Sequence, residues 1–301
     1  MHGKPVVVGI GEVLWDLLPR GAHLGGAPAN FAYFSGLLGA SAVLVSRTGN
    51  DHLGREARDT LLRHGLDLAY CQIDTAHATG STQVSFTGDG SPQYAIAKDV
   101  AWDYLQWTPA LAELAARADA VCFGTLAQRS PVSRETIRRF LEHTPAHCLR
   151  MFDVNLRAPF YSDAIVRESL SLANVLKLSC EELRPVLAAL SLPLSAEVEA
   201  VSHLRRSYGL RAVCLTRGAQ GSVIAVENEV VIHSGMTVDV ADTVGAGDAF
   251  TAAVAMHLLA GSAAQVVSEA ANSLGAWVAS QPGAMPKLQE FDRNNMRLFN
   301  P

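Results

Sequence analysis

Short apolar runs alternate with helical patterns along most of this 301-residue chain, and this alternation restricts the possible folds more than any other feature. Helical patterns near residues 29–38 and 53–64 follow the first two apolar runs, and a candidate helix separates each later pair. The apolar runs cover residues 6–10, 42–46, 120–123, 148–153, 175–178 and 212–216. The pattern predicts βαβ units, in which a mostly parallel central sheet is flanked by helices on both faces.

One stretch, residues 67–103, has no helical period. Within it, residues 81–86 and 93–96 alternate between apolar and polar side chains, and the turn-forming residues 87–92 join them. This arrangement predicts an antiparallel hairpin. A β insertion in an α/β domain is suited to cover a site as a lid. Because such a lid exposes one face, we expect a homodimer formed through it.

Composition and charge limit the classes of function. A hydrophobic content of 49% over 301 residues supplies an ample core for one domain spanning residues 1–301. The net charge of −5 gives no basic footprint for nucleic acid. The five cysteines show no C-x-x-C pairing, as expected for reduced thiols of a cytoplasmic protein. No apolar stretch is long enough to predict a membrane partner.

Two nucleotide-binding motifs are excluded. Gly9 and Gly11 follow an apolar run as in a dinucleotide fingerprint, but Leu14 stands where the third glycine is required. The chain contains no G-x-x-x-x-G-K-[ST] sequence, which excludes a P-loop.

A glycine-rich segment, residues 242–248, comes directly before an apolar helical run at residues 252–259. The start of a helix leaves unpaired N–H groups and a partial positive charge, so this turn is a candidate phosphate site. Asp248 would repel an anion that was only bound there. Its carboxylate is better explained as an acceptor for the proton of an attacking hydroxyl group, although an ordinary helix cap remains the alternative.

Six segments, taken in order, resemble the ribokinase-like sugar kinases, which are also called the phosphofructokinase B family. They are residues 25–30 (GGAPAN), 49–54 (GNDHLG), 153–157 (DVNLR), 177–182 (KLSCEE), 216–221 (TRGAQG) and 242–248 (DTVGAGD). The resemblance runs the whole length of the chain. It implies a ribokinase-like three-layer α/β sandwich whose β lid lies mainly within residues 67–103, with a contribution from residues 12–25. It also implies transfer of the γ-phosphate of ATP to a sugar hydroxyl group.

The resemblance assigns a set of sugar-binding residues. Asp16, Gly25, Gly26 and Asn30 match the family's sugar positions, and Gln83, Tyr94 and Ile96 lie on the lid. Hydroxyl groups are held well by polar groups in fixed directions, and glycine lets the backbone approach a sugar ring. From the residues alone, Asn30 is equally a helix N-cap, the glycine pair an ordinary turn, and the lid pattern that of a half-buried hairpin.

The catalytic and nucleotide positions also come from the resemblance. Asp248 matches the catalytic base, the amides of Gly245, Ala246 and Gly247 form the anion hole, and Arg157 reaches phosphate oxygens. ATP-binding positions are Lys177, Ser179, Thr216, Gly218, Gly221, Asn272, Gly283 and Ala284, each of which is otherwise a turn or core residue.

Metal ions are implied as well. Glu182 matches the family residue that organises hydrated Mg²⁺, with Ser179 in place of the usual Asn of that element. A first-turn helix acid is the alternative explanation of Glu182. Asp242 and the Val244 carbonyl stand where many relatives bind K⁺.

The sugar is predicted less directly. Residues 11–16 and 153–157 resemble the fructokinase branch most. The lid strand at residues 94–98 lacks the Arg with which kinases for acidic sugars pair a carboxylate, so a neutral sugar, fructose, is expected. A 2-keto-3-deoxygluconate kinase and a ribokinase-type kinase remain alternatives. A catalytically inactive sugar-binding regulator on the same fold is the alternative from another class.

Overall fold

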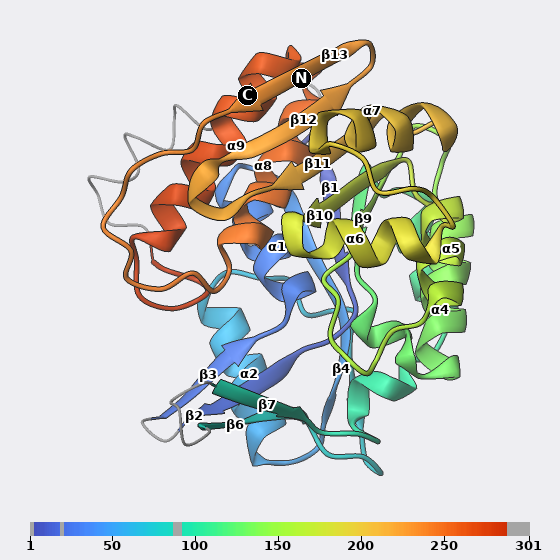
Figure 1. Ribbon diagram of the computed structural model, residues 1–301. Coiled ribbons are helices and arrows are strands. Elements are labelled where there is room, and N and C mark those ends of the chain that lie inside the picture. Colours follow the sequence, from blue (N-terminus) through green and yellow to red (C-terminus); the bar gives the residue numbers. More distant parts are fainter. Residues whose placement is uncertain (1–2, 19–20, 87–91, 288–301) are drawn as a thin grey trace.

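The computed structural model describes residues 3–18, 21–86 and 92–287. Over these residues, strands form a nine-stranded central sheet in the order β13-β12-β11-β10-β9-β8-β1-β4-β5 (Figure 1). Pairing is parallel from β5 to β11 and antiparallel at β12 and β13. The bounds are β1 Val6–Ile10, β4 Ser41–Gly49, β5 Cys71–Asp74, β8 Ala120–Phe123, β9 Leu149–Asp153, β10 Val175–Ser179, β11 Ala212–Thr216, β12 Ser222–Val226 and β13 Glu229–His233.

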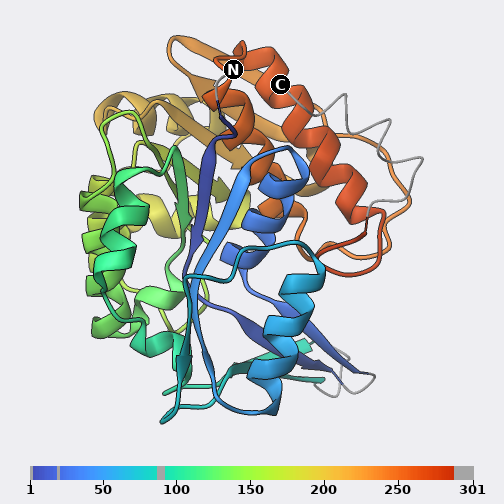
Figure 2. The ribbon, with the colours of Figure 1, turned by 180° about the vertical axis from the view of Figure 1, so that it is seen from behind.

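Helices cover both faces of this sheet (Figures 1 and 2). One face packs against α1 Ala27–Leu37, α2 His52–Arg63, α8 Ala246–Leu259 and α9 Ala264–Ala279. The other packs against α3 Pro109–Ala116, α4 Pro131–Glu142, α5 Asp163–Leu172, α6 Cys180–Ala189 and α7 Glu197–Ser207. Successive strand residues divide between the two cores: Val7 joins the first and Val8 the second. The predicted three-layer α/β sandwich is confirmed.

A second, four-stranded sheet lies at one end of the molecule in the order β3-β2-β6-β7 (Figure 1). Its strands are β2 Leu14–Leu18, β3 Gly21–Gly25, β6 Gly80–Phe86 and β7 Pro92–Ile96. β2 pairs with β6 in parallel, and the other pairs are antiparallel, including the predicted β6–β7 hairpin. Most of the predicted turn at residues 87–92 lies outside the described residues. β5, although it falls within residues 67–103, pairs with β4 in the central sheet.

The segment G-N-D-H-L-G attaches this smaller sheet to the central one. The carboxylate of Asp51 caps α2 through Gly54 N at 2.7 Å and also accepts the amide and hydroxyl of Thr79, at 2.8 and 2.7 Å. Thr79 directly precedes β6. Backbone amides bound to the Asp51 carboxylate hold its pKa below the usual value, although partial burial opposes them. Asp51 is therefore one of the side chains that hold the junction between the sheets, together with Trp15, whose Nε1 donates to Leu53 O at 2.9 Å.

Short 3-10 turns complete the fold: η1 Ala101–Tyr104, η2 Leu126–Arg129 and η3 Gly218–Gln220. Within residues 3–18, 21–86 and 92–287, no helix combines the length and the apolar character required to cross a bilayer. The carboxyl ends of parallel strands gather their following loops at one edge of a sheet, which is where ligands bind in open α/β folds. In this chain that edge faces the four-stranded sheet (Figure 1).

Candidate active site

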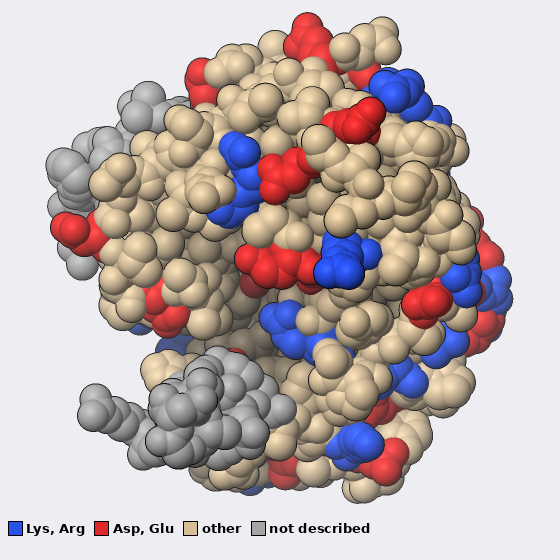
Figure 3. Space-filling model, viewed as in Figure 1, with Lys and Arg blue, Asp and Glu red and all other residues tan. Residues whose placement is uncertain are grey.

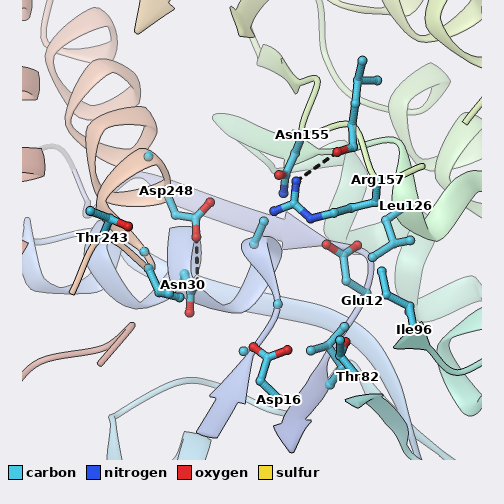
Figure 4. Close-up of a pocket in the computed structure, with 18 of the residues that line it drawn as sticks. Glu12, Asp16, Asn30, Thr82, Ile96, Leu126, Asn155, Arg157, Thr243 and Asp248 are labelled. Atoms are coloured by element: carbon cyan, nitrogen blue, oxygen red, sulfur yellow. Dashed lines mark hydrogen bonds between the residues drawn. The ribbon is translucent and has the colours of Figure 1, made fainter. Parts of the chain in front are cut away.

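A cavity of about 730 Å³ lies between the edge of the central sheet and the four-stranded sheet. Figure 3 shows this hollow with acidic and basic side chains close to its rim. The lining residues come from β2, β3, β6, β7 and β10, the link between β1 and β2, the first turn of α1, η2, the segment after β9, and the start of α8 with the residues before it (Figure 4). They are Glu12, Leu14, Asp16, Gly25, Gly26, Ala27, Asn30, Thr82, Ile96, Leu126, Asn155, Leu156, Arg157, Ala158, Lys177, Thr243, Val244, Gly245, Gly247 and Asp248.

Asp248 stands in the first turn of α8 and faces the cavity (Figure 4). Its Oδ2 accepts a hydrogen bond of 2.7 Å from Asn30 Nδ2. Burial, together with the nearby charge of Asp153, raises the pKa of Asp248 to about 7, although the hydrogen bond from Asn30 opposes the shift. A carboxyl group with a pKa near neutrality is suited to accept and release a proton.

The glycine-rich turn takes the shape that an anion site requires. Gly245 is the N-cap of α8 with a left-handed φ of 82°, and a Cβ there would overlap the carbonyl oxygen of Ala284. A side chain is therefore excluded. The amides of Gly245 and Gly247 have no acceptor among the described residues, whereas Ala246 N donates to Thr243 O at 3.3 Å. Two of the three predicted amides are thus free for an anion, and Ala246, which does not line the cavity, is committed to the turn.

Lys177 places a positive charge beside this turn. It lies on β10, is 9% exposed, and donates to Asp153 Oδ1 at 3.0 Å. A Cβ on Gly247 would stand 3.2 Å from its Nζ. Burial by itself would lower the pKa of Lys177, but the surrounding carboxylates, Asp153 first, outweigh it and raise that pKa. Thr251 donates to the other oxygen of Asp153 at 3.0 Å, so the ammonium group is held in place and charged.

The residues that the sequence predicts to bind sugar meet on the opposite wall. Gly26 has a φ of 123°, and a Cβ there would overlap the carbonyl oxygen of Glu12. Because α1 is capped by Gly26, Asn30 is not an N-cap, and the alternative explanation for Asn30 is wrong. Asp16 lines the cavity from β2, and burial raises the pKa of its carboxyl group. Gly25 leaves room for that carboxylate: a Cβ on it would stand 3.0 Å from Asp16 Oδ2.

The lid residues differ in position. Ile96 on β7 and Thr82 on β6 line the cavity and are paired in the register. Gln83 is the residue after Thr82, is exposed and does not line the cavity, because neighbouring residues of a strand point to opposite faces. The side chain of Tyr94 lies outside those that the structure describes.

Arg157 is exposed and lines the cavity from the segment after β9 (Figure 4). Within the described chain its guanidinium group makes one hydrogen bond, from Nη1 to the carbonyl of Leu156 at 3.0 Å. Asn155, two residues earlier, has a φ of 40° and also lines the cavity. The remaining guanidinium donors are therefore available to a ligand.

Glu182 lies outside the cavity lining and organises the backbone around it. Its Oε1 accepts Leu156 N at 2.6 Å and its Oε2 accepts Ser179 N at 2.8 Å, and with Ser179 it forms the capping box of α6. Glu182 is therefore an acidic residue in the first turn of α6, which is the alternative explanation given in the sequence analysis. Both oxygens keep further lone pairs, so the group fits Mg²⁺ through water molecules rather than by direct ligation.

Of the predicted nucleotide-side positions, Lys177 lines this cavity, and the other seven do not. Gly218 and Gly221 form the turn η3 with φ values of 56° and 82°, and Thr216 ends β11. Asn272, which the sequence analysis predicts as an ATP-binding residue, has a different role in the structure. Its Nδ2 donates to Ser222 Oγ at 2.8 Å and to Ser268 O at 2.7 Å, so it ties α9 to β12 inside the core.

Asp242 joins the two turns next to α8. Its carboxylate accepts Val244 N at 3.0 Å and Gly283 N at 3.3 Å, and Ala284 packs against Gly245. The Gly283–Ala284 turn therefore supports the anion site from behind rather than lining the cavity. Of the two candidate K⁺ residues, Val244 lines the cavity and Asp242 does not.

The sequence analysis did not select Glu12, Thr82, Asn155 or Asp153 as single site residues. These residues lie next to glycine-rich segments or at strand ends, and nothing in the sequence around them indicated a function of their own. Burial of the carboxyl groups of Glu12 and Asp153 raises the pKa of each, to about 7 for Glu12. Such shifts depend on tertiary burial, which a linear pattern does not contain.

Together, the half-buried Asp248 carboxyl group of raised pKa, a helix start with free amides, and two cations around one cavity are typical of a phosphotransferase site. The sequence profile of the pfkB family of carbohydrate kinases matches residues 20–290. The chain therefore belongs to the pfkB family of carbohydrate kinases.

Individual relatives agree with this membership. Escherichia coli fructokinase is 30% identical over 255 residues, which cover 81% of each chain. A sugar kinase from Pyrococcus horikoshii, solved in complex with ATP, superposes with a TM-score of 0.81 at 26% identity and covers 98% of both chains. Vibrio cholerae fructokinase, solved with fructose, ADP and calcium, superposes with a TM-score of 0.78 at 25% identity and covers 97% of this chain and 98% of its own.

Proposed function

We propose that this enzyme transfers the γ-phosphate of ATP to a hydroxyl group of a neutral sugar and that fructose is the preferred sugar. The observation that carries the proposal is the half-buried Asp248 carboxyl group, held by Asn30 at 2.7 Å in front of the free amides of Gly245 and Gly247. A base and an anion site then act on the same reacting centre.

The proposed mechanism uses the residues as they lie. The sugar occupies the wall formed by Asp16, Gly26 and Asn30, with its acceptor hydroxyl toward Asp248. Asp248 takes the hydroxyl proton as the oxygen attacks the γ-phosphorus, and the bond to the β-phosphate oxygen breaks. The amides of the turn, with the cationic Lys177 and Arg157, stabilise the negative charge on the transferring group.

Mg²⁺ bound to the phosphates of ATP would neutralise charge on those oxygens during transfer. Glu182 is the residue that supports the proposal for this ion, through water molecules. Its position between Leu156 N and Ser179 N also fixes the segment that carries Arg157. Mg²⁺ thus remains part of the proposed function.

The preference for a neutral sugar rests on charge in the sugar half of the cavity. Asp16 and Glu12 are acidic there, and β7 carries no arginine. A sugar carboxylate would be desolvated beside two carboxyl groups, which is unfavourable. The fructokinase relatives support fructose as the sugar, with a ribokinase-type acceptor and 2-keto-3-deoxygluconate as the alternatives.

The test is an ADP-release assay with ATP, Mg²⁺ and a panel containing fructose, ribose, 2-keto-3-deoxygluconate and nucleosides. We expect the highest kcat/KM with fructose. A higher kcat/KM with another member of the panel would replace fructose by that sugar. Sugar binding in calorimetry without any ADP release would favour the catalytically inactive regulator instead.

We also propose that K⁺ activates the enzyme through Asp242 and the carbonyl of Val244. Asp242 holds the Thr243–Gly245 turn in register with Gly283, so a cation beside it would stiffen the anion site. We expect kcat to rise several-fold when K⁺ replaces the tetramethylammonium ion at constant ionic strength. Equal rates in both salts would contradict this role.

A further inference from the structure

Glu12 is a buried carboxyl group in the cavity wall that the proposed reaction does not yet use. It follows β1 in the short link to β2, is 3% exposed, and lines the cavity (Figure 4). Burying a carboxyl group is costly unless its oxygens find partners. Its position therefore calls for a partner.

Two backbone amides lie near the Glu12 carboxyl group. The backbone amides of Glu12 itself and of Ala27, the first residue of α1, interact with the carboxyl group and favour its ionised form. The other oxygen, Oε2, is buried and has no hydrogen-bond partner among the described residues. Glu12 thus lies close to the start of the helix that carries Asn30 and keeps one acceptor unused.

Arg157 is the complementary group. It is exposed, makes one hydrogen bond within the described chain, and attracts Glu12 across the cavity. Figure 4 shows the Glu12 carboxyl group and the Arg157 guanidinium group in the same part of the cavity. Arg157 also influences the carboxyl groups of Asp16 and Asp248. These two groups already have proposed roles, Asp16 in binding the sugar and Asp248 as the base.

We propose that Glu12 is a positioning residue: in the enzyme loaded with sugar and nucleotide, its Oε2 accepts a hydrogen bond from Arg157 and directs the guanidinium group toward the transferring phosphate. This inference rests on the proposed role of Arg157 at the phosphate. A long, exposed arginine has many rotamers, and a buried anion that holds one of them lowers the entropic cost of reaching the transition state. Glu12 also transmits the position of α1, which carries Asn30, to the phosphate side of the cavity.

The experiment is a double-mutant cycle on the full chain with Glu12→Gln, Arg157→Ala and the double variant. Glutamine retains an oxygen for the Ala27 amide but presents an NH₂ group, rather than an acceptor, to the arginine. We expect Glu12→Gln to lower kcat by about tenfold with the KM for sugar within about threefold. The double variant should then be within about twofold of Arg157→Ala, because the two residues act as one unit.

Glu113→Gln is the matched control, since Glu113 is exposed on α3 and distant from the cavity lining. It should leave kcat and the midpoint of thermal unfolding unchanged. The kinetics use whichever sugar of the panel is turned over fastest, so a wrong choice of sugar and a wrong role for Glu12 give different results.

Three results would overturn the inference. Losses that multiply fully in the double variant would show that the two residues act independently. A rise in the KM for sugar at constant kcat would make Glu12 a substrate contact, and wild-type kinetics of Glu12→Gln would leave it without a role in turnover. A crystal structure with sugar and a non-hydrolysable ATP analogue gives a further readout. We expect Glu12 Oε2 about 2.7–3.2 Å from an Arg157 nitrogen, and a guanidinium group turned away would also refute the inference.

Discussion

At the scale of single residues, the site depends on how burial and neighbouring charges set the protonation states of Asp248 and Lys177. Burial raises the pKa of Asp248 to about 7, while Lys177 stays protonated because Asp153 lies 3.0 Å from its Nζ. A general base works best with a pKa near the pH at which it operates. Burial thus prepares one acid for proton transfer, and a buried ion pair keeps the neighbouring cation charged.

Asp248→Asn tests the base directly. The asparagine keeps the shape of the side chain and an oxygen for Asn30 but does not accept a proton from the sugar. We expect kcat to fall by roughly 10²–10⁴-fold while the Kd of ATP, measured by calorimetry, changes little. Normal turnover by this variant would rule out Asp248 as the base.

The pH dependence follows from the direction of the same shift. Burial raises the pKa of Asp248 from 3.8 to about 7, so the carboxyl group becomes protonated and inactive as pH falls through about 7. We expect kcat/KM to rise with pH up to about 7 and then level off. A rate profile from pH 5 to 9 checks this, and a profile that is flat down to pH 5 would contradict the assigned pKa.

At the scale of elements, α8 shows how a helix end becomes a site. Its residues from Ala249 to Leu258 are buried between neighbouring helices, which fixes the helix position. Its first turn then presents free amides to the cavity, and Gly245 provides the left-handed residue before it. Because the buried part of α8 directly follows its first turn, the packing of the helix also sets the position of that turn.

Gly245→Ala tests the importance of that start. Alanine at a φ of 82° is strained, and its Cβ would overlap the Ala284 carbonyl, so the turn must shift. We expect a loss of stability of about 1–3 kcal/mol together with a fall in kcat of at least tenfold. Chemical denaturation and steady-state kinetics measure the two effects.

The control lies at the opposite end of the same helix. Gly261 has a φ of 71°, but a Cβ there meets no atom within 4 Å. Gly261→Ala should therefore lose about 1 kcal/mol of stability while kcat is unchanged. If both variants lost activity equally, backbone strain in α8 rather than the anion site would be the cause.

At the scale of the whole molecule, the cavity exists because two sheets face each other. The edge of the central sheet and the start of α8 supply the proposed catalytic and phosphate-binding residues, and β2, β3, β6 and β7 supply the other wall (Figures 1 and 2). In the register of β2 and β3, Asp16 pairs with His23, whereas Leu17 pairs with Ala22. Alternation along the strands therefore places Leu17 and Ala22 on the face opposite the cavity. Leu17 is half-buried against the core of the same chain, whereas Ala22 is exposed at the outer edge of this face.

The predicted homodimer through this face has a direct test. We expect sedimentation velocity at micromolar concentration to give twice the chain mass of 32.0 kDa. Ala22→Glu, which places a charge on the exposed outer face of β3, should give a single-chain mass. Ala116→Glu, the same change at an exposed position of α3, serves as the control. A monomeric wild-type protein would contradict the prediction.

Strands and helices were largely predictable because hydrophobic periodicity is local. The runs at 6–10, 120–123 and 212–216 coincide with β1, β8 and β11, and the helix predicted at 29–38 begins two residues earlier, after Gly26. The pairing of the strands was harder to predict from the sequence. The parallel pairing of β2 with β6 and the place of β5 beside β4 depend on contacts between distant segments.

For the site, the sequence by itself determined which residue types were available: a glycine-rich helix start, a following carboxylate and cations at strand ends. The chemistry of a glycine-rich helix start is local, so the motif was enough to select Asp248 and Gly245, whereas Lys177 was selected through the family resemblance. Only the tertiary structure decided which groups meet and in what charge state. It brings Asn30 to Asp248 across 218 positions, uses Asn272 inside the core, and leaves Glu12 with a free oxygen, because burial and hydrogen bonding depend on distances that exist only after folding.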